Sequence, residues 1–240
     1  MLKRLGFLLA ALLGMICHPA FADSKIFVAS SLVDVVDPLV EASNIDGLTI
    51  VVGSSSSLAR QIKAGAPAGL FISANEDWAQ YVADDKELRP LFSNRLVLIS
   101  HEQQSIADIA QLPELLKEGR LAVADPDHVP AGIYARQALE SLSVWQSLHH
   151  RLAPADNVRA AAQLVGAGAA PFGIVYQSDA QLLQLNVAYE FGADTHMPII
   201  YWMVAMGHDQ PEVGAFVSFL GSEEARDIVA SYGFVPLERQ

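Results

Sequence analysis

The sequence LTIVVGSSSSLARQIKAG at residues 48–65 contains the structural unit that indicates the fold class. Its first five residues are a short apolar run rich in β-branched side chains, which predicts a buried strand. Residues 58–64 have the apolar spacing of a short helix that ends at Gly65, shortly before Pro67. A strand that passes through small polar residues directly into a helix is the basic unit of an α/β protein with a mainly parallel sheet.

The same unit recurs along the chain. Apolar runs predict further strands at 26–29, 70–72, 96–99, 121–123, 172–176 and 201–206. Periodic segments predict helices at 32–42, from 78 onward, and at 133–142, 158–165, 213–220 and 223–231. No repeat of fixed period and no Pro- or Ser-rich linker divides the chain. If there are two lobes, the chain is therefore expected to cross between them on extended segments, near Leu98 and Trp202.

The N-terminus has the pattern of an export signal. Two basic residues at 3–4 precede an apolar core at 5–16 and the small-x-small cleavage site AFA at 20–22. The apolar run is too short to be a permanent membrane span. We expect residues 1–22 to be removed after Ala22 and the mature protein to be periplasmic; an uncleaved N-terminal anchor is the alternative.

Composition excludes several functional classes. Hydrophobic residues make up 52% of the 240-residue chain, which is enough for a real core. The net charge of −12 is opposite to that of a nucleic-acid binder, so no nucleic-acid partner is expected. Cys17, the only cysteine, lies in the export signal, which excludes disulfides and cysteine nucleophiles from the mature chain. An anion binder of this charge needs local, oriented donors, because its overall field repels the ligand.

Small residues, most of them polar, follow predicted strands or precede predicted helices at four junctions. They lie at 30–31, 54–57, 130–132 and 156–157. Each junction leaves backbone N–H groups without intrahelical acceptors, at the positive end of a helix dipole. In a parallel sheet such junctions meet at the carboxyl edge, where open α/β folds bind ligands. Together they predict a site for an anion that is held by neutral donors.

Other interpretations remain open for each residue. Every junction alone is explained by ordinary helix capping, and Tyr176 at a strand end by a core aromatic. A secreted serine hydrolase would use Ser55 or Ser31 with a histidine such as His128, but there is no nucleophile elbow. The histidines are scattered without the spacing of a metal site, and no cofactor is expected.

Several stretches, in order across nearly the whole chain, resemble the molybdate-binding proteins of bacterial ABC importers. They are VASSL at 28–32, SSSSLARQIKAGAPA at 54–68, FISA at 71–74, DPDHVPAGIY at 125–134, LAPADNVR at 152–159, PFGIVY at 171–176, SDA at 178–180 and YGF at 232–234. The resemblance implies a type II periplasmic binding protein, with two α/β lobes, a ligand cleft and two crossover strands. With the expected crossings, residues 23–99 and 203–240 form the first lobe and 100–202 the second.

The resemblance also implies the residues of the site. Ser31 and Ser55 would donate hydroxyl and backbone hydrogen bonds to the oxyanion. Ala131 and Val158 would donate backbone N–H groups, and Tyr176 its phenolic hydroxyl. The metal of the oxyanion would be held through its oxygens, with no direct coordination by the protein.

The implied function is a binding protein rather than an enzyme. It would be a monomer that captures molybdate or tungstate and delivers it to the membrane permease of an ABC importer. The chain departs from the family at two positions. Ser30 replaces a usual alanine, so it is either an additional donor or an alternative to Ser31, and Gly69 replaces a common acidic residue. A receptor for sulfate, phosphate or another tetrahedral oxyanion is the alternative within the same class.

Overall fold

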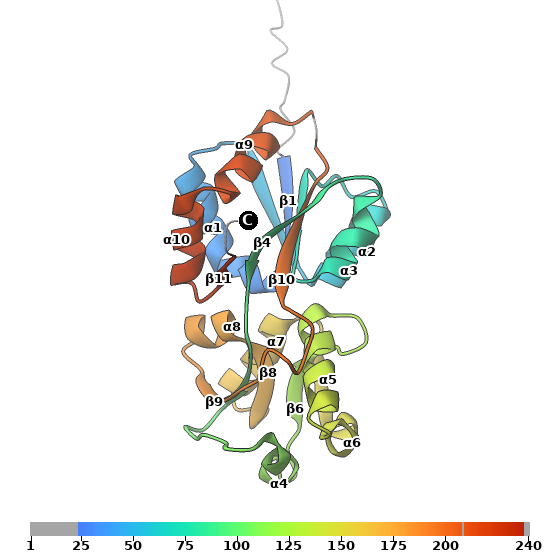
Figure 1. Cartoon of the computed structure of the whole chain (residues 1–240), viewed down its shortest axis with the longest axis vertical. Helices are drawn as coiled ribbons and strands as arrows, with labels where there is room; N and C mark the ends of the chain where they lie inside the picture. The colour runs from blue at the N-terminus through green and yellow to red at the C-terminus, as the bar shows by residue number, and fades with distance from the viewer. Residues whose placement is uncertain (1–23, 208, 238–240) are drawn as a thin grey trace, which may run out of the picture.

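Two α/β lobes, each built on its own sheet, are stacked along the long axis of the molecule (Figure 1). The computed structural model describes residues 24–207 and 209–237. The expected export signal lies outside these residues. Within them, no helix is long and apolar enough to cross a bilayer.

The first lobe contains the N- and C-terminal parts of the described chain. Its sheet has the order β11-β4-β10-β3-β1-β2, in which β1 is parallel to β2 and β3, and β10 is antiparallel to β3 and β4. In Figure 1, helices α1, α9 and α10 lie on one side of the sheet and α2 and α3 on the other. The strands are β1 (Ser24–Ala29), β2 (Leu48–Gly53), β3 (Leu70–Ser73), β4 (Leu88–Ser93), β10 (Ile200–Ala205) and β11 (Val235–Pro236). The helices are η1 (Ser30–Leu32), α1 (Val33–Ser43), α2 (Ser55–Lys63), α3 (Glu76–Ala83), α9 (Pro211–Leu220) and α10 (Glu223–Ser231).

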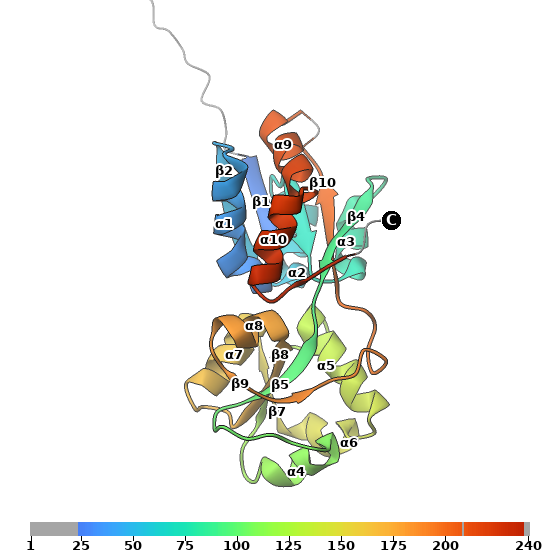
Figure 2. The same ribbon diagram turned by 60° about the vertical axis from the view of Figure 1, so that its left-hand side comes forward.

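The second lobe is formed by the middle of the chain (Figure 2). Its sheet has the order β7-β6-β8-β5-β9, in which β6 is parallel to β7 and β8, and β5 is antiparallel to β8 and β9. The strands are β5 (Leu96–Ser100), β6 (Leu121–Ala124), β7 (Leu152–Ala155), β8 (Phe172–Tyr176) and β9 (Asn186–Glu190). The helices are η2 (Ile109–Gln111), α4 (Leu112–Leu115), α5 (Pro130–Ser141), α6 (Trp145–Leu148), η3 (His149–Arg151), α7 (Val158–Gly166) and α8 (Gln177–Leu182).

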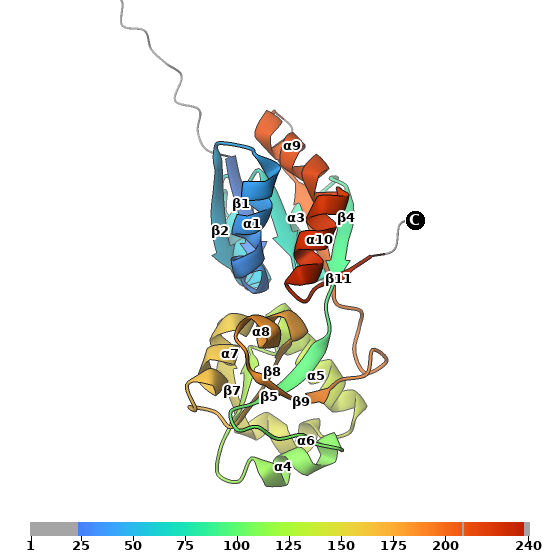
Figure 3. The same cartoon turned by 90° about the vertical axis from the view of Figure 1, so that its left-hand side faces the viewer.

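The chain crosses between the lobes earlier than the sequence pattern indicates. The expected boundaries, after residues 99 and 202, place β5 in the first lobe and part of β10 in the second. β5 instead pairs with β8 and β9, and β10 pairs with β3 and β4. The crossings therefore lie between β4 and β5 and between β9 and β10 (Figure 3). An apolar run predicts a strand but does not say which sheet the strand joins.

The predicted strands and helices are present, but the sheets are mixed and further strands complete them. β4, β7, β9 and β11 were not expected. Pro90 in β4 and Pro154 in β7 obscure the strand pattern, because proline cannot donate to a ladder. β7 is an edge strand, and Pro90 lies opposite Trp202, next to a register shift in β10. Both positions tolerate a missing N–H.

The burial of the central strands of both sheets explains the apolar runs in the sequence. Every residue of β3, β5, β6 and β8 is buried. Helices cover both faces of the first sheet, so its inner strands cannot alternate between apolar and polar side chains. Buried residues of the two sheets belong to one hydrophobic cluster, and a smaller cluster packs α2 and α3 against the first sheet.

Candidate ligand-binding site

A small cavity lies between the lobes, where strand ends of both sheets meet. Its cavity volume is about 10 Å³. Sites for drug-sized molecules measure roughly 300–1,000 Å³, so this closed cavity has room only for a very small ligand. It is lined by Ala29, Ser30, Ser31, Ser54, Ser55 and Ala74 from the first lobe and by Val129, Pro130, Ala131, Val158 and Tyr176 from the second. The structure therefore brings together all five residues implied by the resemblance, together with Ser30.

Helix N-termini supply backbone donors from both lobes. Ser55 is the first residue of α2, Val158 the first of α7 and Ala131 the second of α5. The N–H groups in the first turn of a helix have no acceptor within the helix. All three residues are at least 98% buried, so an unmatched N–H at these positions would be costly. An acceptor in the cavity would remove this cost.

The close approach of α5 to the sheet depends on Gly132. A Cβ atom at this position would collide with the backbone carbonyl oxygens of Ala124 and Asp125. Glycine therefore lets the first turn of α5 pack directly against the end of β6. This packing fixes the direction of the Ala131 N–H.

The side chain of Ser31 is oriented by Tyr201, which lies on β10 just after the chain returns to the first lobe. Its Oγ lies 2.7 Å from the Tyr201 hydroxyl oxygen, and either group could be the donor. Asn94 Nδ2 lies 3.5 Å from the same tyrosine oxygen and donates to it. If Tyr201 accepts from Asn94 and donates to Ser31, the Ser31 proton is available to a ligand. An anion, which can only accept, selects this arrangement.

Ser55 is oriented in a similar way. Its Oγ accepts a hydrogen bond of 3.0 Å from the backbone N–H of Ala74. The hydroxyl has one proton, which this contact does not use. Ser55 can therefore donate both its hydroxyl and its backbone N–H to a ligand. The neighbouring Ser54 caps α2 instead, by accepting from the N–H of Ser57.

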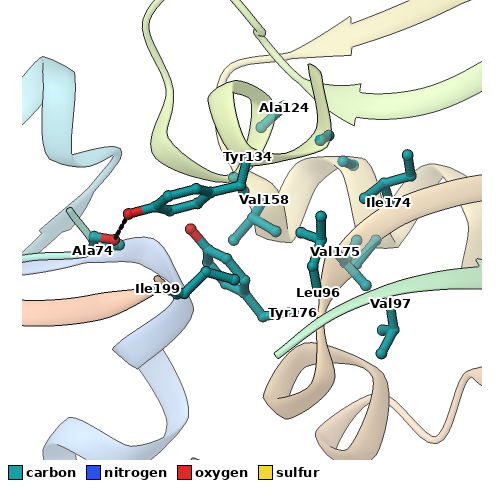
Figure 4. Packing of buried hydrophobic residues seen from close by; sticks show 14 of the residues in the cluster. Ala74, Leu96, Val97, Ala124, Tyr134, Val158, Ile174, Val175, Tyr176 and Ile199 are labelled. Carbon is teal, nitrogen blue, oxygen red and sulfur yellow. Dashed lines mark hydrogen bonds between the residues drawn. The ribbon is translucent and has the colours of Figure 1, made fainter. Parts of the chain in front are cut away.

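Tyr176 has a buried hydroxyl with no hydrogen-bond partner in the described part of the chain. In Figure 4 its oxygen points out of the second lobe, toward the region where the Tyr134 hydroxyl meets the carbonyl oxygen of Ala74. Burial is the main cause that raises the pKa of Tyr176 well above its ordinary value. The group therefore stays protonated as a donor, and a buried donor without a partner is a costly feature unless a ligand accepts from it.

The cavity contains no ionised group to balance an anion. Among the described residues that line it, none has a charged side chain. The guanidinium of Arg159 lies behind the N-terminus of α7, where it is paired with Asp34 at 2.6 Å and Asp179 at 3.3 Å. The Asp34 carboxylate therefore offsets this cation, with the buried Asp179 carboxyl beside it. Neutral hydroxyl and amide donors dominate the local electrostatics.

The buried Asp179 gives the protein a pH-dependent stability. Burial raises the pKa of its carboxyl from 3.8 to about 7, although the neighbouring Arg159 guanidinium acts to lower it. Between about pH 4 and 7 the folded protein keeps a proton that the unfolded chain has released, so the contribution of Asp179 to the free energy of unfolding falls as pH rises. Asp34, Tyr176 and Tyr201 are the other ionisable groups coupled to this carboxyl.

We expect Asp179→Asn to gain stability relative to the wild type over this pH interval. Urea unfolding of ligand-free protein at about pH 4.5 and about pH 8 measures the difference between the two proteins. A difference that does not change with pH would show that Asp179 titrates at its ordinary value.

Contacts between the lobes show that the cleft is closed. The Trp78 indole N–H donates to the carbonyl oxygen of His128 at 2.8 Å. At the opposite end of the interface, Gln181 Nε2 donates to the carbonyl oxygen of Ser231 at 3.1 Å. These contacts surround the cavity, so a ligand would enter or leave by separation of the lobes.

The residues of a serine hydrolase are not arranged as a catalytic unit. His128 pairs through Nδ1 with Asp125 at 3.3 Å and lines a separate groove at the mouth of the cleft. Ser31 and Ser55 line the closed cavity, and their hydroxyl groups form hydrogen bonds with the Tyr201 hydroxyl and the Ala74 backbone N–H, not with a histidine. Among the described residues, no group of three or more His, Cys, Asp or Glu side chains could hold a metal ion.

Sequence reasoning did not identify several residues of the site. Tyr201 lies 170 residues from Ser31, and no local pattern connects them. Ala74 follows a predicted strand, and the FISA stretch could have indicated it. In the sequence, Asp34 and Arg159 look like ordinary surface charges. They form an ion pair only because the two lobes face each other.

Comparison with known proteins gives a consistent family. The family model of the bacterial extracellular solute-binding proteins matches residues 25–235. The chain is 40% identical to the molybdate-binding protein ModA of Escherichia coli, covering 94% of this chain and 95% of the relative. It is 36% identical to ModA of Haemophilus influenzae, with coverage of 90% and 91%.

Solved structures agree on the fold. The Azotobacter vinelandii periplasmic molybdate-binding protein superposes with a TM-score of 0.79 at 21% identity, covering 90% of this chain and 100% of that one. The sulfate-binding protein SubI of Mycobacterium tuberculosis superposes with a TM-score of 0.72 at 15% identity, covering 90% and 88%. These structures support the two-lobed architecture, and the sequence relatives define the group. The chain belongs to the bacterial extracellular solute-binding proteins, which are binding components rather than enzymes, in the group that contains the ModA molybdate-binding proteins.

Proposed function

We propose that this protein captures molybdate, or the equally charged tungstate, in the periplasm and delivers it to the permease of an ABC importer. The observation that carries the proposal is the closed cavity lined by neutral donors from both lobes. The names of the relatives at 40% and 36% identity support molybdate as the ligand. Ser31, Ser55, Ala131, Val158 and Tyr176 are the proposed contacts, and Ser30 is an additional donor beside them.

Binding and closure are coupled in this proposal. The anion first meets the donors of the first lobe, and the second lobe then closes over it. Closure removes water, which strengthens hydrogen bonds to a charged ligand. The closed form presents both lobes in one fixed arrangement, which a membrane permease would recognise.

The donor set also explains selection among oxyanions. The fixed donors fit one anion size, so the smaller sulfate would leave some of them unpaired, at about 1–3 kcal/mol each. Phosphate carries a proton at neutral pH and needs an acceptor for it. The side chains that line the cavity include no carboxylate. Molybdate and tungstate, which are dianions without such a proton, fit best.

Titration of anion-stripped protein tests the ligand. Isothermal calorimetry with molybdate, tungstate, sulfate and phosphate should give tight binding for the first two and weak or no heat for the others. Ligand at a hundred times its dissociation constant should stabilise the fold by about 2.7 kcal/mol, which a thermal melt detects. Binding of sulfate without binding of molybdate would favour a sulfate receptor, and saturable hydrolysis of a generic ester would overturn the whole class.

A further inference from the structure

An ion pair joins the two lobes beside the cavity. Asp34 Oδ2, from α1 of the first lobe, lies 2.6 Å from Arg159 Nη2, from α7 of the second. The Asp34 side chain is 48% exposed and the Arg159 side chain 11%. The pair therefore lies at the edge of the interface, with its cation inside. Because the partners belong to different lobes, opening of the cleft separates them.

Both partners are fixed close to proposed ligand contacts. Asp34 follows Ser31 by three residues, on the helix that continues directly from η1. Arg159 immediately follows Val158 at the N-terminus of α7. Asp179 of the second lobe holds Arg159 Nε at 3.3 Å, which leaves the other end of the guanidinium for the first lobe. The ion pair thus connects the two helix N-termini that face each other across the anion.

We propose that Asp34 and Arg159 are positioning residues that form a closure pair, which holds the lobes shut around the anion and slows its release. This inference rests on the proposed function. Neither residue is among those lining the cavity, so the pair acts through the positions of Ser31 and Val158. The other contacts described across the interface are hydrogen bonds between uncharged groups, such as Trp78 to His128.

The sign of the effect separates a closure pair from simple electrostatics. Asp34 carries a negative charge in the first turn of α1, close to the proposed anion site. Its removal should tighten anion binding if only long-range repulsion counts. Loss of the closure pair should instead weaken binding, through faster release. Asp37 on the same helix is exposed and has no ion pair among those the structure describes, so Asp37→Asn is a matched control for charge.

Stopped-flow fluorescence tests the pair with the full-length mature protein and molybdate. Trp78 donates across the interface and provides the optical signal for closure. We expect Asp34→Asn to release molybdate about five-fold faster than the wild type, with the association rate unchanged, as for an ion pair worth about 1 kcal/mol. Asp37→Asn should release it no faster than the wild type. Asp34→Glu, which keeps the charge, should recover most of the slow release.

Each outcome separates the possible roles. Equal release rates for Asp34→Asn and Asp37→Asn would overturn the closure pair while the proposed function stands. A wild type that does not bind molybdate would overturn both. If Asp34 only stabilised α1 through the helix dipole, Asp34→Asn would lower the unfolding free energy of the ligand-free protein, and its release rate would match that of Asp37→Asn.

Discussion

Replacement of Val158 with proline is expected to weaken molybdate binding about 10- to 150-fold without loss of the fold. The change deletes one backbone N–H, which corresponds to about 1.5–3 kcal/mol for a hydrogen bond to a charged group. Val158 is the first residue of α7, a position where proline is favoured. Asn157 before it has extended backbone at φ −161° and ψ 170°, as a residue before proline requires.

The matched control for this variant is Val158→Ala. It shortens the same buried side chain but keeps the backbone N–H. Calorimetry should show near wild-type affinity for alanine and a large loss for proline, and circular dichroism should show the same helix content in both. Equal affinity in the two variants would mean that the Val158 N–H does not contact the ligand.

Replacement of Tyr176 with phenylalanine is expected to weaken molybdate binding without lowering the stability of the ligand-free protein. Molybdate affinity should fall by about ten-fold or more, because a donor to the charged ligand is lost. The free energy of unfolding without ligand should be no lower than that of the wild type, since the hydroxyl has no partner in the described protein. Calorimetry and urea unfolding measure the two quantities.

Tyr134→Phe is the control for this second prediction. Tyr134 is also buried, and its hydroxyl donates a long hydrogen bond of 3.4 Å to the carbonyl oxygen of Ala74. It does not line the cavity, so its loss should change affinity much less than the loss of the Tyr176 hydroxyl. A Tyr176→Phe protein that binds molybdate as tightly as the wild type would remove Tyr176 from the site.

The architecture could be predicted from sequence where the signal is local. The strand, serine and helix succession at 48–64 indicates a junction by itself, and β2 and α2 are found there. The four junctions belong to different lobes, and their convergence depends on how the lobes face each other. Local pattern alone left capping as an explanation for each, and the family resemblance selected the ligand contacts.

The remainder could not be predicted because it depends on pairing between distant segments. β5 is an apolar run like its neighbours, but it is antiparallel to β8 and β9 and belongs to the second sheet. The hydrogen bond between Ser31 and Tyr201 joins the end of β1 to β10, which is distant in the sequence. Asp34 and Arg159 have no shared motif. Such contacts arise from the closed arrangement of the lobes, which no short stretch encodes.

In the proposed function, uncharged hydroxyl and amide donors of both lobes enclose a dianionic metal-oxo ligand. Anomalous diffraction at the molybdenum edge, from crystals grown with molybdate, locates this ligand. We predict one strong peak in the cavity, with ligand oxygens within hydrogen-bond distance of Ser31, Ser55 and Tyr176 and of the Ala131 and Val158 nitrogens. A molybdenum peak elsewhere, or these groups turned away from the ion, would contradict it.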